Sequence, residues 1–182
     1  HASMMDKILF LFWILAWSAG GLLLAAVTFH LPRRLIFGVG LALGAVTQAW
    51  FANLLGFFLP APVAFWGGAL LTLALGLAFA WPLSWEEIRR TFLPVSWRQV
   101  LALVFLVYIF TAIGRGLLLF EDYQNLPTIS LMARGDIPPQ FALDPNVRFG
   151  YHYLMLLFAA QVTRLGGIVP WNALDFTRGL FF

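Results

Sequence analysis

Between Leu35 and Trp85 the sequence contains no Asp, Glu, Lys or Arg, which leaves 51 consecutive uncharged residues. A helix needs about 20 apolar residues to cross the hydrocarbon core of a bilayer, so this stretch is long enough for two crossings. Charged residues make up 10% of the chain and hydrophobic residues 62%, whereas soluble domains carry about 25% charged residues. The sequence therefore excludes a soluble globular enzyme and predicts an all-α, multi-pass transmembrane helical bundle.

Apolar runs and their punctuation predict the order of the helices. An interfacial helix is expected near residues 85–93, because Ser84 with Glu87 has the spacing of a capping box. Ser96 with Gln99 repeats that spacing at the start of the next helix. We expect four membrane-spanning helices within residues 5–120 and a fifth, shorter helix after a long loop, at about Ile8–Phe29, Leu35–Leu59, Ala61–Leu83, Trp97–Phe120 and Tyr151–Leu165.

The two ends of the chain have distinct features. Residues 1–4 resemble the remnant of a cloning vector. A new helix opens at Pro170 with Asn172 as a plausible N-cap, and its eleven residues rise only about 16 Å before the sequence stops at Phe182. We therefore expect residues 151–182 to hold the fifth helix and the start of a truncated further helix. The chain is then expected to be an N-terminal fragment that is inactive alone.

The distribution of basic residues predicts the orientation of the bundle. Connections that carry arginine clusters face the cytoplasm in most membrane proteins. The first and third connections carry such clusters and a single lysine, Lys7, opposes them; the arginines are Arg33, Arg34, Arg89, Arg90 and Arg98. The amino terminus and residues 121–150 are therefore expected outside the cell membrane. The net charge of +3 is accounted for by these clusters, so we expect no nucleic acid partner.

Small and polar residues inside the spans predict how the helices pack. Gly40 and Gly44 form a GxxxG motif, which favours close approach within a compact bundle. Gln48 and Asn53 lie in the second span, where each amide needs an interhelical partner or a wet cavity. The chain has no cysteine, which excludes disulfides and thiolate chemistry.

Residues 121–150 hold four of the eight acidic residues of the chain. Glu121 and Asp122 follow the fourth span directly and could bind a divalent cation or supply a general base. They could equally be solvated acids at a helix end. A short amphipathic helix on the membrane surface is expected from about Leu126 to Ala133, capped by Asn125 and stopped by Gly135.

Three further residues near this loop are candidates for substrate binding. Arg115 lies between two glycines near the outer end of the fourth span, where a guanidinium could hold a lipid phosphate, pair with the loop acids or reach the interface. His152 could transfer a proton or serve as an interfacial hydrogen-bonding group. Asp136 opens a rigid Asp-Ile-Pro-Pro turn. Two later arginines, Arg164 and Arg178, are expected near the inner face as anchors.

These loop residues carry a resemblance to a known family. Glu121-Asp122-Tyr123, the helix Leu126–Arg134, Gly135–Pro139 and Tyr151-His152-Tyr153 resemble the first outer loop of GT-C-type glycosyltransferases, which are related to protein mannosyltransferases. The resemblance covers roughly Tyr108–Phe182. In many members of that family the loop follows the first helix, whereas here three spans precede the helix before the loop.

The resemblance implies an enzyme that moves a sugar from a polyprenyl-phosphate donor to an acceptor at the extracytoplasmic face. It implies that Glu121 and Asp122 position or deprotonate the acceptor, or bind a divalent metal such as Mg²⁺ or Mn²⁺. Arg115, Asp136 and His152 are then assigned to substrate binding. The partners are membrane lipid and the lipid-linked sugar, and the oligomeric state is open. The alternative is a non-enzymatic transporter, flippase or membrane-assembly subunit in which Gln48, Asn53 and Arg115 line a path.

Overall fold

The computed structural model describes residues 3–92, 96–116, 122–141, 144–148 and 153–181, and its fold is all-α apart from one small hairpin. This confirms the predicted fold class at the level of helix content. The elements in chain order are α1 (Met4–Thr28), α2 (Arg33–Gly56), α3 (Ala61–Ala80), α4 (Trp85–Phe92), α5 (Trp97–Gly116), α6 (Asp122–Arg134), β1 (Gln140–Phe141), β2 (Asp144–Arg148), α7 (Leu154–Gly166) and α8 (Pro170–Phe181).

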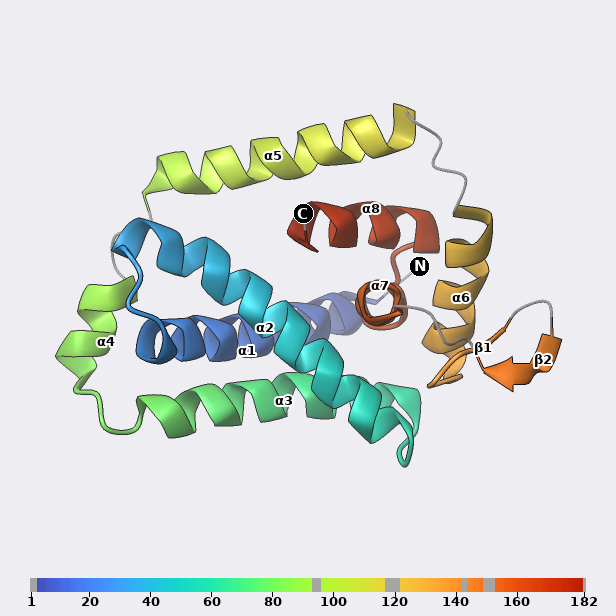
Figure 1. Ribbon diagram of the computed structural model, residues 1–182, viewed down its shortest axis with the longest axis horizontal. Helices are drawn as coiled ribbons and strands as arrows, with labels where there is room; N and C mark the ends of the chain where they lie inside the picture. Colours follow the sequence, from blue (N-terminus) through green and yellow to red (C-terminus); the bar gives the residue numbers. More distant parts are fainter. Residues whose placement is uncertain (1–2, 93–95, 117–121, 142–143, 149–152, 182) are drawn as a thin grey trace.

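Helices α1, α2 and α3 pack against one another and form one unit, hereafter the α1–α3 unit (Figure 1). Each is long and apolar enough to cross a membrane. The first three predicted spans are therefore confirmed as apolar helices of spanning length. The fourth predicted span is helix α5, which packs against α8; its crossing of a membrane stays a prediction.

Glycines bring the backbones of the α1–α3 unit into direct contact. A side chain at Gly21 of α1 would meet the backbone of Gly40 and Gly44 on α2. Its neighbour Gly20 lies against the backbone of Thr72 on α3. The GxxxG motif therefore serves packing between helices of the same chain. Helix α1 contacts α2 and α3 through two adjacent residues, Gly21 and Gly20.

Helix α4 begins at a capping box, as the sequence predicts. The backbone N–H of Ser84 donates to Glu87 Oε2 at 2.7 Å, and the backbone N–H of Glu87 donates to Ser84 Oγ at 3.3 Å. Ser96 and Gln99 exchange the equivalent hydrogen bonds at the start of α5, at 2.9 and 3.3 Å. Both starts depend on residues three positions apart, which is why the sequence alone locates them.

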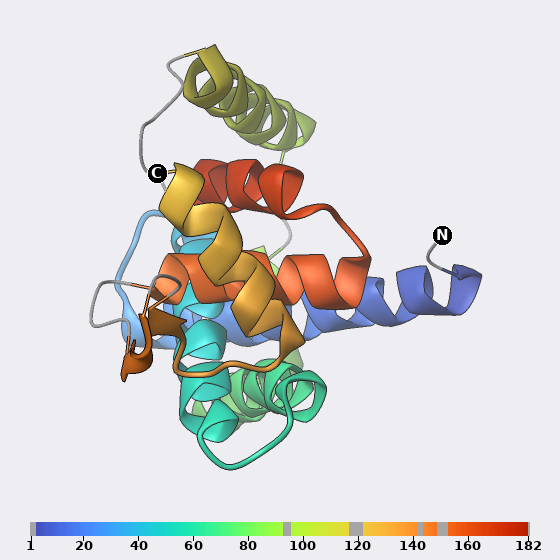
Figure 2. The ribbon, with the colours of Figure 1, turned by 90° about the vertical axis from the view of Figure 1, so that its right-hand side faces the viewer.

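Helices α6, α7 and α8 form a second group, hereafter the α6–α8 group, whose members contact one another. Helix α7 is seen end-on in Figure 1 while α2, α3 and α5 run across the view, so α7 crosses those helices. With 13 residues it is about 20 Å long. Figure 2 shows that the C-terminal ends of α6 and α7 lie on the same side of the molecule as the N-terminus of α1.

Helix α6 begins earlier than expected. It starts at Asp122, so Asn125 lies inside the helix and is not its cap. The predicted apolar stripe is present: Ile129 and Met132 are fully buried and belong to the same core as α7. The stripe therefore contacts protein in this structure. The helix ends as predicted at Gly135, whose φ of 121° suits glycine.

The segment after α6 contacts the turn between α2 and α3. Gly56 lies against the side chain of Ile137, which is 8% exposed, and Gly135 lies beside Ala61. A short antiparallel hairpin follows, with Gln140 paired to Arg148. We call the end of the α1–α3 unit that carries Asp6, Gly56 and Ala61 the polar end; it is the end that the arginine distribution predicts to be extracytoplasmic.

Trp13 connects the two groups of helices. It is fully buried on α1, and its indole N–H donates to the backbone carbonyl of Phe65 on α3 at 3.2 Å. Its ring centroid lies 5.6 Å from that of Phe158 on α7. One side chain of α1 thus contacts both α3 and α7.

Candidate functional site

The residues that the resemblance assigns to catalysis are only partly covered by the structure. Glu121 and His152 lie outside the described residues. Asp122 is the first residue of α6 and Arg115 lies near the end of α5, but the side chains of both are outside the described part. Their assignments therefore stay predictions. Among the residues that the structure describes, no group of three His, Asp or Glu side chains comes close enough to hold a metal ion.

Asp136 is placed, and its carboxylate has a structural contact. Its Oδ2 accepts a hydrogen bond from the backbone N–H of Gln140 at 2.9 Å. This contact spans the turn that contains Ile137 and leads into the hairpin. Asp136 therefore stabilises the shape of the loop at the polar end, and its role in substrate binding remains a prediction.

Asn53 and Gln48 have different environments although both lie on α2. The phenol of Tyr153 donates to Asn53 Oδ1 at 2.8 Å, which gives Asn53 a partner from the segment preceding α7. Gln48 is fully buried, and neither its amide nitrogen nor its amide oxygen has a partner in the described part of the chain. The predicted partner is thus confirmed for Asn53. For Gln48 the described residues provide no partner, and the alternative of a wet cavity stays a prediction.

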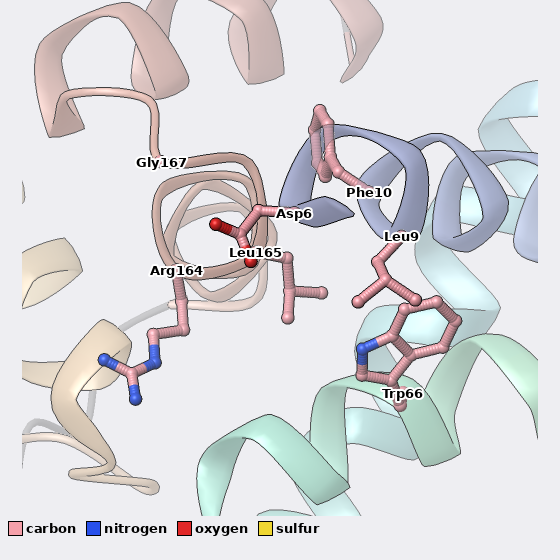
Figure 3. A pocket seen from close by; sticks show the side chains of 7 residues that line it. All are labelled: Asp6, Leu9, Phe10, Trp66, Arg164, Leu165 and Gly167. Atoms are coloured by element: carbon pink, nitrogen blue, oxygen red, sulfur yellow. The ribbon is translucent and has the colours of Figure 1, made fainter. Parts of the chain in front are cut away.

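A first pocket, of about 400 Å³, opens at the polar end between α1, α3 and α7. The Asp6 carboxylate and the Arg164 guanidinium both line it (Figure 3), and no ion pair joins them. The remaining lining residues are mostly apolar: Leu9, Phe10, Trp66, Leu165 and Gly167. The pocket therefore combines an apolar wall with one group of each charge.

A second pocket, of about 300 Å³, lies where the ends of α6, α7 and α8 meet. Its lining comprises the polar residues Arg134, Arg164, Ser130 and Thr163, with Ala133 and Pro170 beside them. The Ser130 hydroxyl donates to the Leu126 carbonyl at 2.9 Å. Arg164 lines both pockets, so the two cavities are neighbours that share this residue.

Arg164 lies at the opposite end from the one expected. The sequence suggested the inner face for it, but it shares a pocket with Asp6 at the polar end. The difference arises because α7 is short and crosses the α1–α3 unit, so its C-terminal turn does not reach the far end of the bundle.

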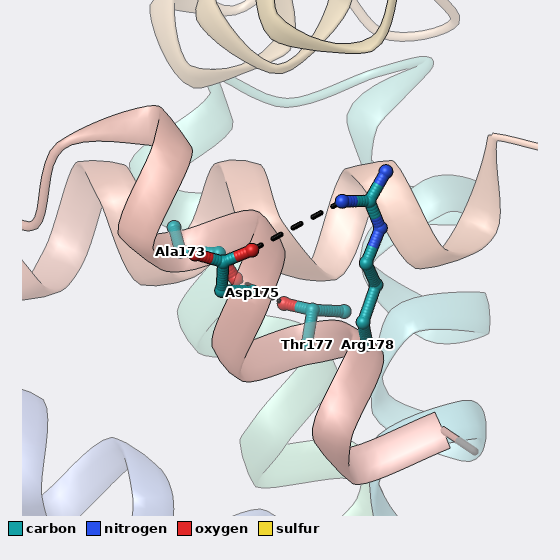
Figure 4. A network of polar contacts seen from close by, with 4 residues as sticks. All are labelled: Ala173, Asp175, Thr177 and Arg178. Atoms are coloured by element: carbon teal, nitrogen blue, oxygen red, sulfur yellow. Dashed lines mark hydrogen bonds and ion pairs between the residues drawn. The ribbon is translucent and has the colours of Figure 1, made fainter. Parts of the chain in front are cut away.

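Helix α8 contains a buried polar group of its own. Asp175 is 4% exposed and lies 4.0 Å from Arg178 (Figure 4). The hydroxyl of Thr177 donates to the backbone carbonyl of Ala173 at 2.7 Å. The helix starts at Pro170, so Asn172 is within it and is not its N-cap. Asp175 and Arg178 therefore act within the packing of α8 rather than in either pocket.

Sequence reasoning missed Arg134 and Thr163 and misplaced Arg164. A signal was present: each arginine lies in the last turn of a helix that ends at a glycine with positive φ, Gly135 or Gly167. Cations are favoured there by the helix dipole, which is also a sufficient structural reason for both arginines. The sequence did not reveal that the two helix ends converge.

Comparisons with protein-family models, with curated proteins and with solved structures find no match for this chain. The arguments on function therefore depend on the residues and on their arrangement.

Proposed function

We propose that the chain is a membrane portion of a GT-C-type glycosyltransferase that transfers a sugar from a polyprenyl phosphate to an acceptor at the extracytoplasmic face. One observation carries the proposal: at the polar end, the apolar helices α1 and α3 line a pocket with Arg164, and Arg164 also lines a neighbouring pocket with Arg134, Ser130 and Thr163. A lipid-linked sugar presents chemistry in the same order, from an apolar tail through a phosphate to a polar sugar.

In the proposed reaction, the carboxylate of Glu121 or Asp122 accepts the proton of the acceptor hydroxyl. The acceptor oxygen forms a bond to the anomeric carbon, and the bond between that carbon and the phosphate oxygen breaks. Arg115 offsets the negative charge on the leaving lipid phosphate. Glu121 and Asp122 are also the residues that would hold a Mg²⁺ or Mn²⁺ ion, which supplies Lewis acidity when bound.

The test is donor-dependent transfer by the complete natural protein that carries this sequence. Glu121→Gln and Asp122→Asn are expected to lower the turnover number at least about 100-fold in one or both variants, as for loss of a general base. Glu86→Gln is the matched control, because this exposed carboxylate lies on α4, beyond the other end of α3. Full activity in both loop variants contradicts the assignment.

A transporter or flippase remains the second candidate because the buried Gln48 amide has no partner in the described part of the chain. A side chain that lines a path would explain such an amide. In that case Gln48→Leu abolishes flux in reconstituted vesicles while the loop-acid variants are tolerated. If the chain is a transferase, Gln48→Leu leaves transfer intact.

A further inference from the structure

We infer that Arg134 and Arg164 bind the phosphate group of a ligand in the second pocket at the polar end. The identification of that ligand as a lipid phosphate rests on the proposed function, whereas the pocket is defined by the described residues alone. Arg134 is the last residue of α6, and Arg164 lies in the last turn of α7. The fold thus brings two arginines from helices that are separate in sequence onto the lining of one cavity of about 300 Å³.

The charges around this pocket favour an anion. A guanidinium donates hydrogen bonds and accepts none, and it can donate two parallel hydrogen bonds to two oxygens of one phosphate. The carboxyl ends of α6 and α7 oppose an anion, while the amino end of α8 at Pro170 favours one. When each helix end is counted as half a charge, the two arginines, the two carboxyl ends and the one amino end together carry a net charge of roughly +1.5. A phosphate of one to two negative charges matches that value.

Neither guanidinium is neutralised by a carboxylate among the described residues. Asp6 is the acidic residue on the lining of the first pocket, and it forms no ion pair with Arg164. Its Oδ2 instead accepts hydrogen bonds from the backbone N–H and the hydroxyl of Ser3, each at 2.8 Å. No acidic side chain lines the second pocket in the described part of the chain.

Thr163 supplies an independent observation. It lies one residue before Arg164 on the pocket lining, and its hydroxyl oxygen is buried without a hydrogen-bond partner in the part of the chain that the structure describes. A buried hydroxyl without a partner costs about 1–3 kcal/mol. A phosphate oxygen that reaches this hydroxyl, which is closed off from solvent in this structure, would accept its hydrogen bond.

The neighbouring pocket favours a lipid as the source of the phosphate. The lining of that pocket includes Leu9, Phe10 and Trp66, which lie on the far side of Leu165 from the Arg164 guanidinium (Figure 3). Leu9 is also 44% exposed on the outer face of α1. An apolar chain attached to a phosphate on Arg164 would reach this apolar surface by passing Leu165, whereas a free phosphate makes no such contact.

The experiment measures binding to the complete protein in detergent by thermal shift. The probes are inorganic phosphate and diheptanoyl phosphatidic acid, with diheptanoyl phosphatidylcholine as a lipid that lacks the phosphomonoester. We expect phosphatidic acid to bind at least about tenfold more tightly than inorganic phosphate. Arg134→Gln and Arg164→Gln should each weaken phosphatidic acid binding at least about tenfold. Arg89→Gln, an exposed arginine on α4, is the matched control and should change nothing.

Two further variants separate binding from folding. Arg164→Lys retains the charge and loses the paired geometry, so it should weaken binding less than Arg164→Gln. Thr163→Val should weaken binding of phosphatidic acid about threefold to tenfold. The melting temperature without ligand identifies any variant that has failed to fold. The affinities of the remaining variants for phosphatidic acid then decide whether the site binds phosphate.

Each outcome has a defined meaning. Equal affinity for inorganic phosphate and phosphatidic acid supports the site and assigns it to free phosphate. No binding of either probe, or binding that both arginine variants leave unchanged, overturns the site. Glu121→Gln should retain phosphatidic acid binding, so loss of sugar transfer with binding intact separates the proposed reaction from the phosphate site. Intact transfer with no phosphate binding rejects the site alone.

Discussion

The α1–α3 unit and the α6–α8 group are packed by different means. In the first, long helices meet backbone to backbone through glycines such as Gly20, Gly21 and Gly44. In the second, helices of 13, 13 and 12 residues cross one another, and their ends leave pockets with polar linings. Long helices in close contact fill space along their whole length, whereas short crossing helices leave gaps at their ends. Sites for ligands are therefore expected in the second group.

The largest effect is expected at the closest backbone contact in the α1–α3 unit. Gly21→Leu should destabilise the protein by more than about 4 kcal/mol, which is exceptional for one substitution, because the backbones of Gly40 and Gly44 leave no space. Unfolding in detergent by increasing SDS measures this loss. Gly38→Ala is the control, since nothing lies within 4 Å of the added methyl group. A fully stable Gly21→Leu would refute the close packing of α1 on α2.

A smaller effect is expected where the two groups of helices meet. Trp13→Ala should cost about 3 kcal/mol, near the lower end for a buried tryptophan, because membrane helices gain packing rather than hydrophobic transfer. The variant removes contacts with Phe65 and Phe158 together. The same SDS titration measures it, and Trp81→Ala, at an 88% exposed side chain, serves as control. Equal stability of the two variants would mean that α7 does not depend on α1 for its position.

The hydrogen bond between Tyr153 and Asn53 joins the α6–α8 group to the α1–α3 unit, and its removal tests the contact between these two groups of helices. Tyr153→Phe should lower the free energy of unfolding by about 1 kcal/mol, the usual net value of such a bond. Tyr108→Phe, at a side chain that is 70% exposed, is the matched control. In a double-mutant cycle with Asn53→Leu, the two effects should not add, because both changes remove the same contact.

The smallest effect is expected outside both groups. Ser84→Ala removes the cap of α4 and should cost about 0.5–1 kcal/mol, confined to that helix. Hydrogen exchange of the Glu87 backbone amide, which donates to Ser84 Oγ, should quicken while amides of α2 keep their rates. Slower exchange at Glu87 would mean that α4 starts elsewhere.

Sequence reasoning succeeded where the determining residues lie close together in the chain. The capping boxes at Ser84 and Ser96 depend on a spacing of three, and the apolar helices of the α1–α3 unit depend on continuous composition. The stop at Gly135 follows from one residue. Local rules failed at the start of α6, because Asn125 fits a cap but the helix continues back to Asp122 with Pro127 inside it.

The candidate site was less predictable than the fold, because it depends on how helices cross. Nothing within the sequence of α7 indicates that it lies across the α1–α3 unit, and that crossing brings Arg164 to the polar end. Arg134 reaches the same pocket only through the path of α6. That the buried hydroxyl of Thr163 has no partner among the described residues is known only once its surroundings are known. Such properties arise from tertiary structure and leave no fixed spacing in the chain.

The contact between Gly56 and Ile137 has a consequence for biosynthesis. Gly56 is translated long before Ile137. When Ile137 emerges, the residues of α1, α2 and α3 have all been synthesised, so the turn that contacts Ile137 is already present. Chains assemble from the amino terminus as they are made. The order of synthesis thus matches the order in which the contacts can form, and the loop that follows α6 docks onto a finished support.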